Sequence, residues 1–289
     1  NALRATTVPE QADIFLITVP TPITPEKKAD ISYVESCVRA IAPILKSGDL
    51  VILESTSPVG TTHSICELIQ LLRPDLKCPS KTHQFSDINI AYSPERILPG
   101  QTIKELISNS RVVGGISESC TQKASSFYRC YVKGEILKTN ALTAEMCKLA
   151  ENSYRDLNLA FANELSMICD EADISVRDVI KCSNYHPRVN ILTPGCGVGG
   201  HCIPIDPWFL IEGFENSTDL IKTARNVNLK KTDWICKKIK EKMEFLTKNK
   251  LNSNICILGL SYKKDSDDLR ESPAMQIAKI LSQDTNEKI

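Results

Sequence analysis

Short apolar runs, rich in β-branched residues, alternate with amphipathic stretches through residues 13–137, and this alternation limits the possible folds more than any other feature. Strand-sized runs separated by helical stretches predict a parallel sheet wrapped by helices. The strands that we expect are Asp13–Val19, Leu50–Leu53, Ile88–Tyr92 and Arg111–Val113.

Two of the amphipathic stretches are predicted as helices. Thr61–Leu72 is one of them. The other is Asp30–Lys46, with Asp30 as the cap and apolar residues at helical spacing along one face. The residues of that face are Ile31, Val34, Val38, Ile41 and Leu45.

Three polar or proline-rich loops follow the predicted strands. They are Pro20–Pro22, Glu54–Gly60 and Ser93–Arg96. Parallel sheets bind ligands beyond the carboxyl ends of their strands. We therefore expect these loops to face a ligand.

The second half of the chain has a helical pattern. Ala141–Ala172 and Thr218–Lys248 are predicted as long helices, followed by a buried strand at Asn254–Leu258 and a helix from Pro273. The expected apolar stripe of the first long helix consists of Met146, Leu149, Leu157, Phe161, Leu165 and Ile168. The chain starts at Asn1 without a Met and stops at Ile289 soon after a βα pattern begins, so we expect further sequence beyond both ends.

Charge and composition exclude several classes of partner. The 35 basic residues balance the 35 acidic ones, so bulk electrostatic binding to nucleic acid or to an anionic membrane is not expected. No apolar run is long enough to span a membrane, and we expect no signal peptide. The twelve cysteines are scattered, as is typical of reduced thiols in a cytoplasmic protein.

A glycine-rich loop carries a candidate nucleophile, Cys202. Four of the six residues from Gly195 to Gly200 are glycines, so the backbone can approach a ligand closely, and Asp206 follows four residues after the thiol. A thiol in such a loop is a candidate nucleophile. The alternative is a glycine turn with a buried, inert cysteine.

Two other interpretations of this loop are disfavoured. The spacing G-x-G-x-x-G formed by Gly195, Gly197 and Gly200 indicates dinucleotide binding only between a strand and a helix, and no strand leads into it. Cys196 with His201 and Cys202 lacks the paired spacing of a zinc site, so no metal is expected.

The first long helix carries a second group of candidates. Lys148 and Asn152 lie four residues apart and share a face, which Asp156 extends by another turn. A solvated polar stripe is the alternative. The polar segment Lys263–Glu271 follows a predicted strand, where a sheet presents ligand-binding loops, although a solvated loop remains the alternative there too.

Several segments resemble those of the UDP-sugar 6-dehydrogenases, which oxidise a sugar CH2OH to a carboxylate with NAD. They occur in the family's order and run nearly from end to end of the chain. They are VPTP at Val19–Pro22, ESTSPVGTT at Glu54–Thr62, YSPERILPG at Tyr92–Gly100, AEMCKLAENSYRD at Ala144–Asp156, HPRVN at His186–Asn190, GVGGHCIPIDPWF at Gly197–Phe209 and GLSYKKDSDDLRESPA at Gly259–Ala274.

The resemblance implies an α/β fold in three parts. Residues 1–138 would form an incomplete Rossmann-like NAD-binding domain without its first βαβ unit and GxGxxG, and residues 139–250 a central helical domain for dimerisation and catalysis. Residues 251–289 would begin a second Rossmann-like domain that binds UDP. Without the missing segments we expect the 289-residue chain to be impaired in turnover.

The resemblance also implies catalytic roles. Cys202 would form a thiohemiacetal and then a thioester with the sugar C6. Lys148 would stabilise the developing oxyanion, and Asn152 would position that oxygen or its water. Asp206 would act with Lys148 as a proton relay or would activate water. Glu95 would be the general base for thioester hydrolysis, acting through water and Thr56. We expect Lys148 to be partly buried beside Asp206 and Asn152.

The remaining implied roles concern binding. Pro20, Thr21, Thr56 and Arg270 would border NAD. The UDP-sugar would be held by Glu95, Arg96, Leu98, Lys148, Asn152, Gly199 and Lys263. Arg188 would enter the active site of the neighbouring subunit, which implies a homodimer built through the long central helices.

Two segments limit which sugar the substrate contains. Within the family that the chain resembles, Gly-His-Cys at residues 200–202, followed by Asp-Pro-Trp-Phe, implies an N-acetylhexosamine substrate, because the UDP-glucose enzymes have Gly-Ser-Cys there. The resemblance of Glu-Arg-Ile-Leu-Pro-Gly favours UDP-N-acetyl-D-mannosamine, oxidised to the uronate. Oxidation of UDP-N-acetylglucosamine or UDP-glucose is an alternative. A catalytically incompetent fragment of the same fold is another.

Overall fold

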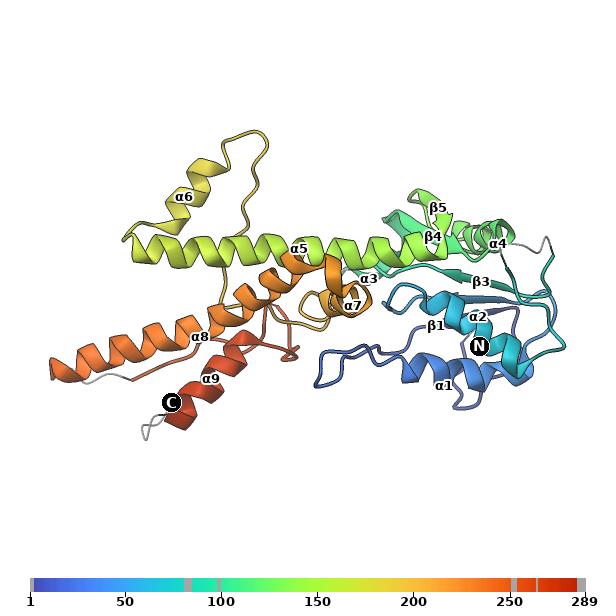
Figure 1. Ribbon diagram of the computed structural model, residues 1–289, viewed down its shortest axis with the longest axis horizontal. Helices are drawn as coiled ribbons and strands as arrows, with labels where there is room; N and C mark the ends of the chain where they lie inside the picture. Colours follow the sequence, from blue (N-terminus) through green and yellow to red (C-terminus); the bar gives the residue numbers. More distant parts are fainter. Residues whose placement is uncertain (1–2, 81–84, 98–99, 251–253, 264, 285–289) are drawn as a thin grey trace. The chain divides into compact units, whose positions relative to one another are not determined.

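The computed structural model describes residues 3–80, 85–97, 100–250, 254–263 and 265–284 (Figure 1). The chain divides into two compact units. The sheet unit comprises Asn1–Ala150 and Trp208–Gly213, and the helical unit comprises Glu151–Pro207 and Phe214–Ile289.

The sheet unit is built on five strands in the order β1-β2-β3-β4-β5. Their bounds are β1 Ile14–Ile17, β2 Leu50–Leu53, β3 Asn89–Tyr92, β4 Arg111–Gly115 and β5 Ile136–Asn140. β1, β2 and β3 are parallel, and β4 is parallel to β5. β5 was not among the predicted strands.

The predicted parallel, Rossmann-like sheet is confirmed for β1 to β3 and for the β4–β5 pair, but β4 runs antiparallel to β3, with Tyr92 opposite Gly114. A parallel continuation requires a crossover element that packs on a face of the sheet. In the described part of the segment between these strands, the only helix is α3 (Thr102–Ser108), none of whose residues is buried. The chain therefore returns along the same edge, and β4 begins at the edge of the sheet where β2 and β3 end.

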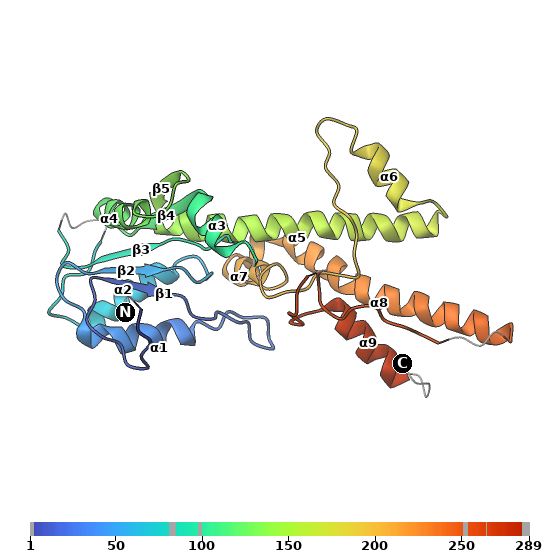
Figure 2. The same ribbon diagram turned by 180° about the vertical axis from the view of Figure 1, so that it is seen from behind.

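Helices cover both faces of the sheet (Figures 1 and 2). α1 (Ser32–Ile41) and α2 (Thr61–Leu72) pack on one face, where Val51 and Leu53 belong to their apolar cluster. α4 (Glu118–Arg129) packs on the other, where Leu50 and Ile52 point. Alternate residues of β2 thus face opposite layers, and all four are buried.

The predicted helix Asp30–Lys46 is confirmed with shorter bounds. α1 begins at Ser32, whose N–H donates to the Asp30 carboxylate at 3.0 Å, and a 3-10 turn, Ala42–Ile44, ends the segment at a proline. Four members of the predicted apolar face are buried, and Ile31 is half-buried. β1, predicted as buried, pairs only with β2 among the described strands, and its Leu16 is 42% exposed.

Two long helices form most of the helical unit, although residues 141–150 of the first belong to the sheet unit, as do Trp208–Gly213. α5 (Ala141–Glu171) and α8 (Asp219–Lys248) end within one residue of their predicted bounds. α6 (Val176–Ser183), α7 (Asp206–Gly213) and a 3-10 turn, Glu215–Ser217, connect them along the chain. α9 (Pro273–Asp284) packs on α8 through Cys236, Ile277 and Leu281.

Two predictions fail in the helical unit. Asn254–Leu258 is irregular rather than a buried strand, and Leu258 is 93% exposed, because no described segment pairs with it. In the predicted stripe of α5, Phe161 and Ile168 are more than half exposed. Polar residues occupy much of the buried face instead. No described helix has the length and apolar character needed to cross a membrane.

Candidate active site

The loops that follow β1 and β2 are joined to each other. The Thr21 hydroxyl donates to the Thr56 carbonyl at 2.5 Å, and the Ser55 hydroxyl donates to the Val19 carbonyl at 2.7 Å. These bonds fix the backbone at the carboxyl edge of two parallel strands, where α/β sheets bind dinucleotides. Thr21 and Thr56, both predicted to border NAD, are therefore brought together.

Glu145 was missed from the sequence but holds the second of these loops. It is buried, and its carboxylate accepts from the Gly60 N–H at 2.6 Å, the Thr62 N–H at 2.8 Å and the Thr62 hydroxyl at 2.6 Å. Burial raises the pKa of this carboxyl. Its signal was a carboxylate among the apolar residues at the start of α5.

A buried charged group lies where β2 and β3 end and β4 begins. Arg111, only 4% exposed, donates to Glu95 at 2.6 Å and to Glu54 at 3.2 Å. The Tyr128 hydroxyl donates to Glu54 at 2.6 Å. Arg111, Glu54 and Tyr128 were not predicted as site residues.

Lys148 joins this group from α5. Its ammonium donates to the Glu95 carbonyl at 2.8 Å, and the residue is buried rather than part of a solvated stripe. The sheet unit therefore brings together two predicted catalytic residues, Lys148 and Glu95. The expected neighbour Asp206 belongs to the helical unit, so that part of the expectation stays a prediction.

In the helical unit, Asn152 and Asp206 meet directly. The Asn152 amide donates to the Asp206 carboxylate at 2.5 Å, and both residues are buried. Asp206 is the first residue of α7, and its N–H donates to the Cys202 carbonyl at 2.9 Å. Cys202, half-buried, thus lies one turn before Asp206, at the entry to the helix.

The glycine-rich loop is held from three directions. The Gly195 N–H donates to Asn163 of α5 and the Thr232 hydroxyl of α8 donates to the Cys196 carbonyl, each at 2.9 Å. The Gly200 N–H donates to the Arg270 carbonyl at 3.0 Å. A Cβ atom on Gly199 would lie 2.5 Å from the Tyr262 Cβ, so this position requires glycine.

Behind this loop, α5 and α8 are joined by buried polar side chains. Arg225 donates to Asp156 at 2.5 Å, and Asn228 donates to the same carboxylate at 2.8 Å. Asn163 donates to Asn228 at 2.9 Å. The solvated-stripe alternative for Asp156 is wrong, since it is 1% exposed.

Beside Cys202 in the sequence, His201 contacts an exposed ion pair. Arg270 donates to the Asp268 carboxylate at 2.9 Å and lies 2.9 Å from the His201 Nδ1. Hydrogen bonds from Arg270 hold the pKa of Asp268 well below its usual range. The Arg270 side chain is 64% exposed and so accessible to a ligand.

The other predicted site residues are less constrained. Pro20 and Arg188 are exposed, and Arg96, Gly199 and Lys263 are half-buried. Leu98 lies outside the described residues. Within the described part of the chain, no group of three or more His, Cys, Asp or Glu side chains is placed to hold a metal ion.

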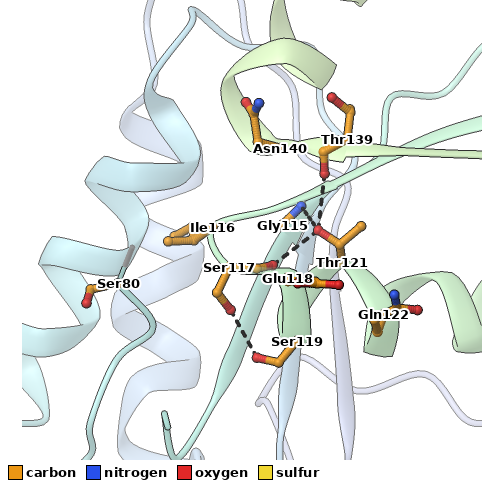
Figure 3. A pocket seen from close by; sticks show the side chains of 10 residues that line it. All are labelled: Ser80, Gly115, Ile116, Ser117, Glu118, Ser119, Thr121, Gln122, Thr139 and Asn140. Atoms are coloured by element: carbon orange, nitrogen blue, oxygen red, sulfur yellow. Dashed lines mark hydrogen bonds between the residues drawn. The ribbon is translucent and has the colours of Figure 1, made fainter. Parts of the chain in front are cut away.

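A separate cavity of about 720 Å³ opens where β4 and β5 end and α4 begins (Figure 3). Hydroxyl groups line it, and Thr121 donates to the carbonyls of Ser117 and Thr139, each at 3.1 Å. Because β4 runs antiparallel to β3, this cavity lies at the sheet edge opposite Thr21, Thr56 and Glu95. Of the predicted site residues that the structure describes, none lines it.

Comparison with known families accounts for most of the chain. Residues 1–132 match the NAD binding domain of the UDP-glucose/GDP-mannose dehydrogenase family, residues 142–230 its central domain and residues 256–287 its UDP binding domain. The chain belongs to this family. It is therefore an NAD-dependent nucleotide-sugar dehydrogenase, which is a type of oxidoreductase.

Individual relatives are similar over nearly the whole chain. A UDP-N-acetyl-D-mannosamine dehydrogenase of Campylobacter jejuni is 52% identical over 99% of this chain and 70% of its own length. The enzyme of that name from Escherichia coli K12 is 50% identical over 97% of this chain and 68% of its own length. An NDP-N-acetyl-D-galactosaminuronic acid dehydrogenase of Ralstonia nicotianae is 50% identical over 97% of this chain and 66% of its own length.

A solved structure supports the same assignment. A UDP-D-ManNAc dehydrogenase from Pyrococcus horikoshii is 39% identical, with a TM-score of 0.85 over 96% of this chain and 64% of its own. The chain spans about two thirds of the length of these relatives.

Proposed function

We propose that the protein oxidises UDP-N-acetyl-D-mannosamine to UDP-N-acetyl-D-mannosaminuronate, removing four electrons with two molecules of NAD. Relatives of that name at 50 to 52% identity support the substrate. The observation that carries the chemistry is the bond between Asn152 and Asp206, with Cys202 one turn before that carboxylate.

The residues at the carboxyl edge of the sheet fit a nicotinamide cofactor. The Thr21–Thr56 hydrogen bond fixes two neighbouring strand-end loops, and Pro20 lies in the first of them. When bound there, NAD supplies the hydride acceptor for each oxidation. We propose that Arg270 also contacts NAD.

Cys202 would retain the sugar between the two oxidations. Its thiolate attacks the C6 aldehyde to form a thiohemiacetal, and the second oxidation leaves a thioester. Water then attacks C6, the C6–S bond breaks, and sulfur leaves as a thiolate. No free aldehyde is released, which is the reason for a nucleophile in this reaction.

The remaining residues act on charges and protons. Lys148 and Asn152 would stabilise the oxyanion on C6, and Asp206 would relay protons with Lys148. Glu95 would take the proton of the hydrolytic water, with Thr56 beside that water. We propose Arg96, Leu98, Gly199 and Lys263 as further contacts of the UDP-sugar.

We also propose a homodimer. Tyr154, Phe161 and Ile168 recur every seven residues on α5 and are 70%, 53% and 55% exposed, so one stripe of the helix is apolar and accessible. Arg188 is exposed and would enter the partner's active site.

We propose a cytoplasmic location for the protein. We also propose three domains: residues 1–138 for NAD binding, residues 139–250 for dimerisation and catalysis, and residues 251–289 as the start of the UDP-binding domain.

A second substrate has specific support. The Ralstonia nicotianae relative named for an N-acetylgalactosaminuronic acid product has the same 50% identity as the Escherichia coli enzyme. Both sugars carry an N-acetyl group, as Gly-His-Cys at residues 200–202 predicts. UDP-N-acetylglucosamine and UDP-glucose complete the set to be compared.

The test is the number of NADH molecules formed per UDP-N-acetyl-D-mannosamine consumed by the full-length protein and by the 289-residue chain. Two NADH per sugar are expected from the full-length protein. If the full-length protein oxidised only another UDP-sugar, the proposed mechanism would stand but the proposed substrate would be wrong. Two NADH per sugar from a Cys202→Ala variant would overturn the nucleophile.

A further inference from the structure

We propose that Arg111 is a positioning residue for the Glu95 carboxylate, and that Glu54 and Tyr128 hold Arg111 in place. The inference rests on the general-base role proposed for Glu95. It adds three residues to the hydrolysis step, none of which contacts the sugar in the reaction described above.

The antiparallel turn of the sheet brings Arg111 to this place. Arg111 is the first residue of β4, whereas Glu54 and Glu95 follow the ends of β2 and β3. Only because β4 runs against β3 does its first residue lie at that edge. In an entirely parallel sheet, Arg111 would lie at the opposite edge, away from both carboxylates.

Both oxygens of Glu95 are fixed. Arg111 Nη2 donates to Oε2 at 2.6 Å, and the N–H groups of Arg96 and Ile97 donate to Oε1 at 2.6 and 2.9 Å. The Glu95 side chain is still 39% exposed, so its remaining lone pairs are open to water. A general base needs this combination of fixed orientation and access.

Arg111 is itself restrained. Its Nη1 donates to Glu54 at 3.2 Å, and its guanidinium lies 4.7 Å from the centre of the Tyr128 ring. Burial and the Glu54 charge raise the pKa of Tyr128, so its hydroxyl stays protonated and donates to Glu54. A planar, two-pronged guanidinium can bridge two carboxylates in this way, whereas a lysine ammonium cannot reproduce the fork.

The consequence is confined to one step. In thioester hydrolysis the water oxygen bonds to C6, its proton passes to Glu95, and the C6–S bond breaks to release the Cys202 thiolate. The two oxidations do not use Glu95. Loss of the Arg111 fork is therefore expected to slow release of the acid and to leave the sugar attached to Cys202.

The experiment uses the full-length protein, mixed rapidly with UDP-N-acetyl-D-mannosamine and NAD and quenched in acid. NADH is followed during the first turnover and at steady state, and the covalent adduct is located by mass on the peptide containing Cys202. Glu95→Gln serves as the reference for blocked hydrolysis. Tyr131→Phe is the matched control for Tyr128→Phe, because their rings are neighbours but only the Tyr128 hydroxyl has a bond to Glu54 in the described part of the chain.

With Arg111→Lys, first-turnover NADH is expected within about threefold of wild type, while steady-state turnover falls at least ~10-fold, below the full ~100-fold or more of a general base. The Cys202 adduct accumulates. Tyr128→Phe gives a smaller fall with the same adduct, and Tyr131→Phe behaves as wild type. Tyr128→Phe preserves the side-chain shape, so it decides the matter if Arg111→Lys does not fold.

Two results overturn the inference in different ways. If Glu95→Gln accumulates the adduct but the Arg111 and Tyr128 variants do not, Arg111 does not position Glu95. The same conclusion follows if first-turnover and steady-state rates fall in parallel. If Glu95→Gln itself accumulates no adduct, the general-base role is wrong, and the positioning role is wrong with it.

Discussion

The sheet unit and the helical unit are held together by different physics. In the sheet unit, residues of β2 and β3 are buried between apolar helix faces, and Arg111 meets Glu54 and Glu95 at the strand ends. In the helical unit, α5 and α8 are joined by Asp156, Arg225 and Asn228, all buried. Apolar contacts are non-directional, whereas hydrogen bonds fix the register of two helices.

This difference suits the parts of the proposed site that each unit supplies. The sheet unit presents loops at strand ends, which the apolar core positions and which hydrogen bonds between the loops and from Glu145 hold in place. The helical unit has to hold a glycine-rich loop with little intrinsic order. It does so by direct bonds from Asn163 and Thr232 to the loop backbone.

Breaking the buried ion pair is expected to have the largest effect. Asp156→Leu leaves Arg225 charged without its partner in a buried place, and should lower the free energy of unfolding by about 3–5 kcal/mol. Urea unfolding followed by circular dichroism measures it. The double variant Asp156→Leu, Arg225→Met should recover part of the loss, and a double variant as unstable as the single one would contradict this account.

The apolar side of the comparison is tested by Leu53→Ala. Leu53 is fully buried in the cluster beneath α1 and α2, so the cavity should cost about 2–5 kcal/mol in free energy of unfolding. Leu53→Met, which conserves volume, should cost less than about 1.5 kcal/mol. An equal loss for Asn228→Leu and Leu53→Met would show that packing alone governs both units.

Gly199→Ala sharpens the role of the glycine-rich loop. The added methyl group would meet Tyr262 and the Glu271 carbonyl, with an expected cost of about 1–3 kcal/mol. The displaced loop should also change the rate at which iodoacetamide alkylates Cys202. Gly213→Ala is the control, because nothing lies within 4 Å of a Cβ placed there. A wild-type alkylation rate in Gly199→Ala would contradict the tight fit.

Lys231→Met should have the smallest effect on stability at neutral pH. Lys231 is buried against the Trp234 ring and donates to Ser166, and burial lowers its pKa below the ordinary 10.5. At a pH between the lowered pKa of the folded state and the ordinary pKa of the unfolded state, the unfolded chain binds more protons than the folded one. The contribution of Lys231 to the free energy of unfolding therefore rises with pH in that window. The difference between wild type and variant should therefore grow in favour of wild type as pH approaches 10.5, and a pH-independent difference would contradict the burial argument.

Much of the local structure could be predicted from patterns. α2 has its predicted bounds, and α5 and α8 are within one residue of theirs, because helical periodicity is a local property. Cys202, Lys148 and Asn152 were found because a thiol among glycines and a polar face on a helix are visible in the sequence. Their catalytic roles remain predictions.

The failures have a common cause. Asn254–Leu258 has a strand-like composition, but a strand requires a neighbour to pair with, and composition does not supply one. Asp156 and Asn163 resemble surface residues until α8 brings Asn228 to both. In each case the deciding contact comes from a residue far away along the chain.

The sequence by itself therefore determined α1, α2, α5, α8 and α9, most of the strands of the sheet and the candidate nucleophile, because periodicity and residue chemistry act over a few positions. Only the tertiary structure decided the direction of β4 and, with it, the place of Arg111 between Glu54 and Glu95. Strand direction depends on whether the connecting segment packs on the sheet. That is a property of the folded chain, which no local pattern around Arg111 records.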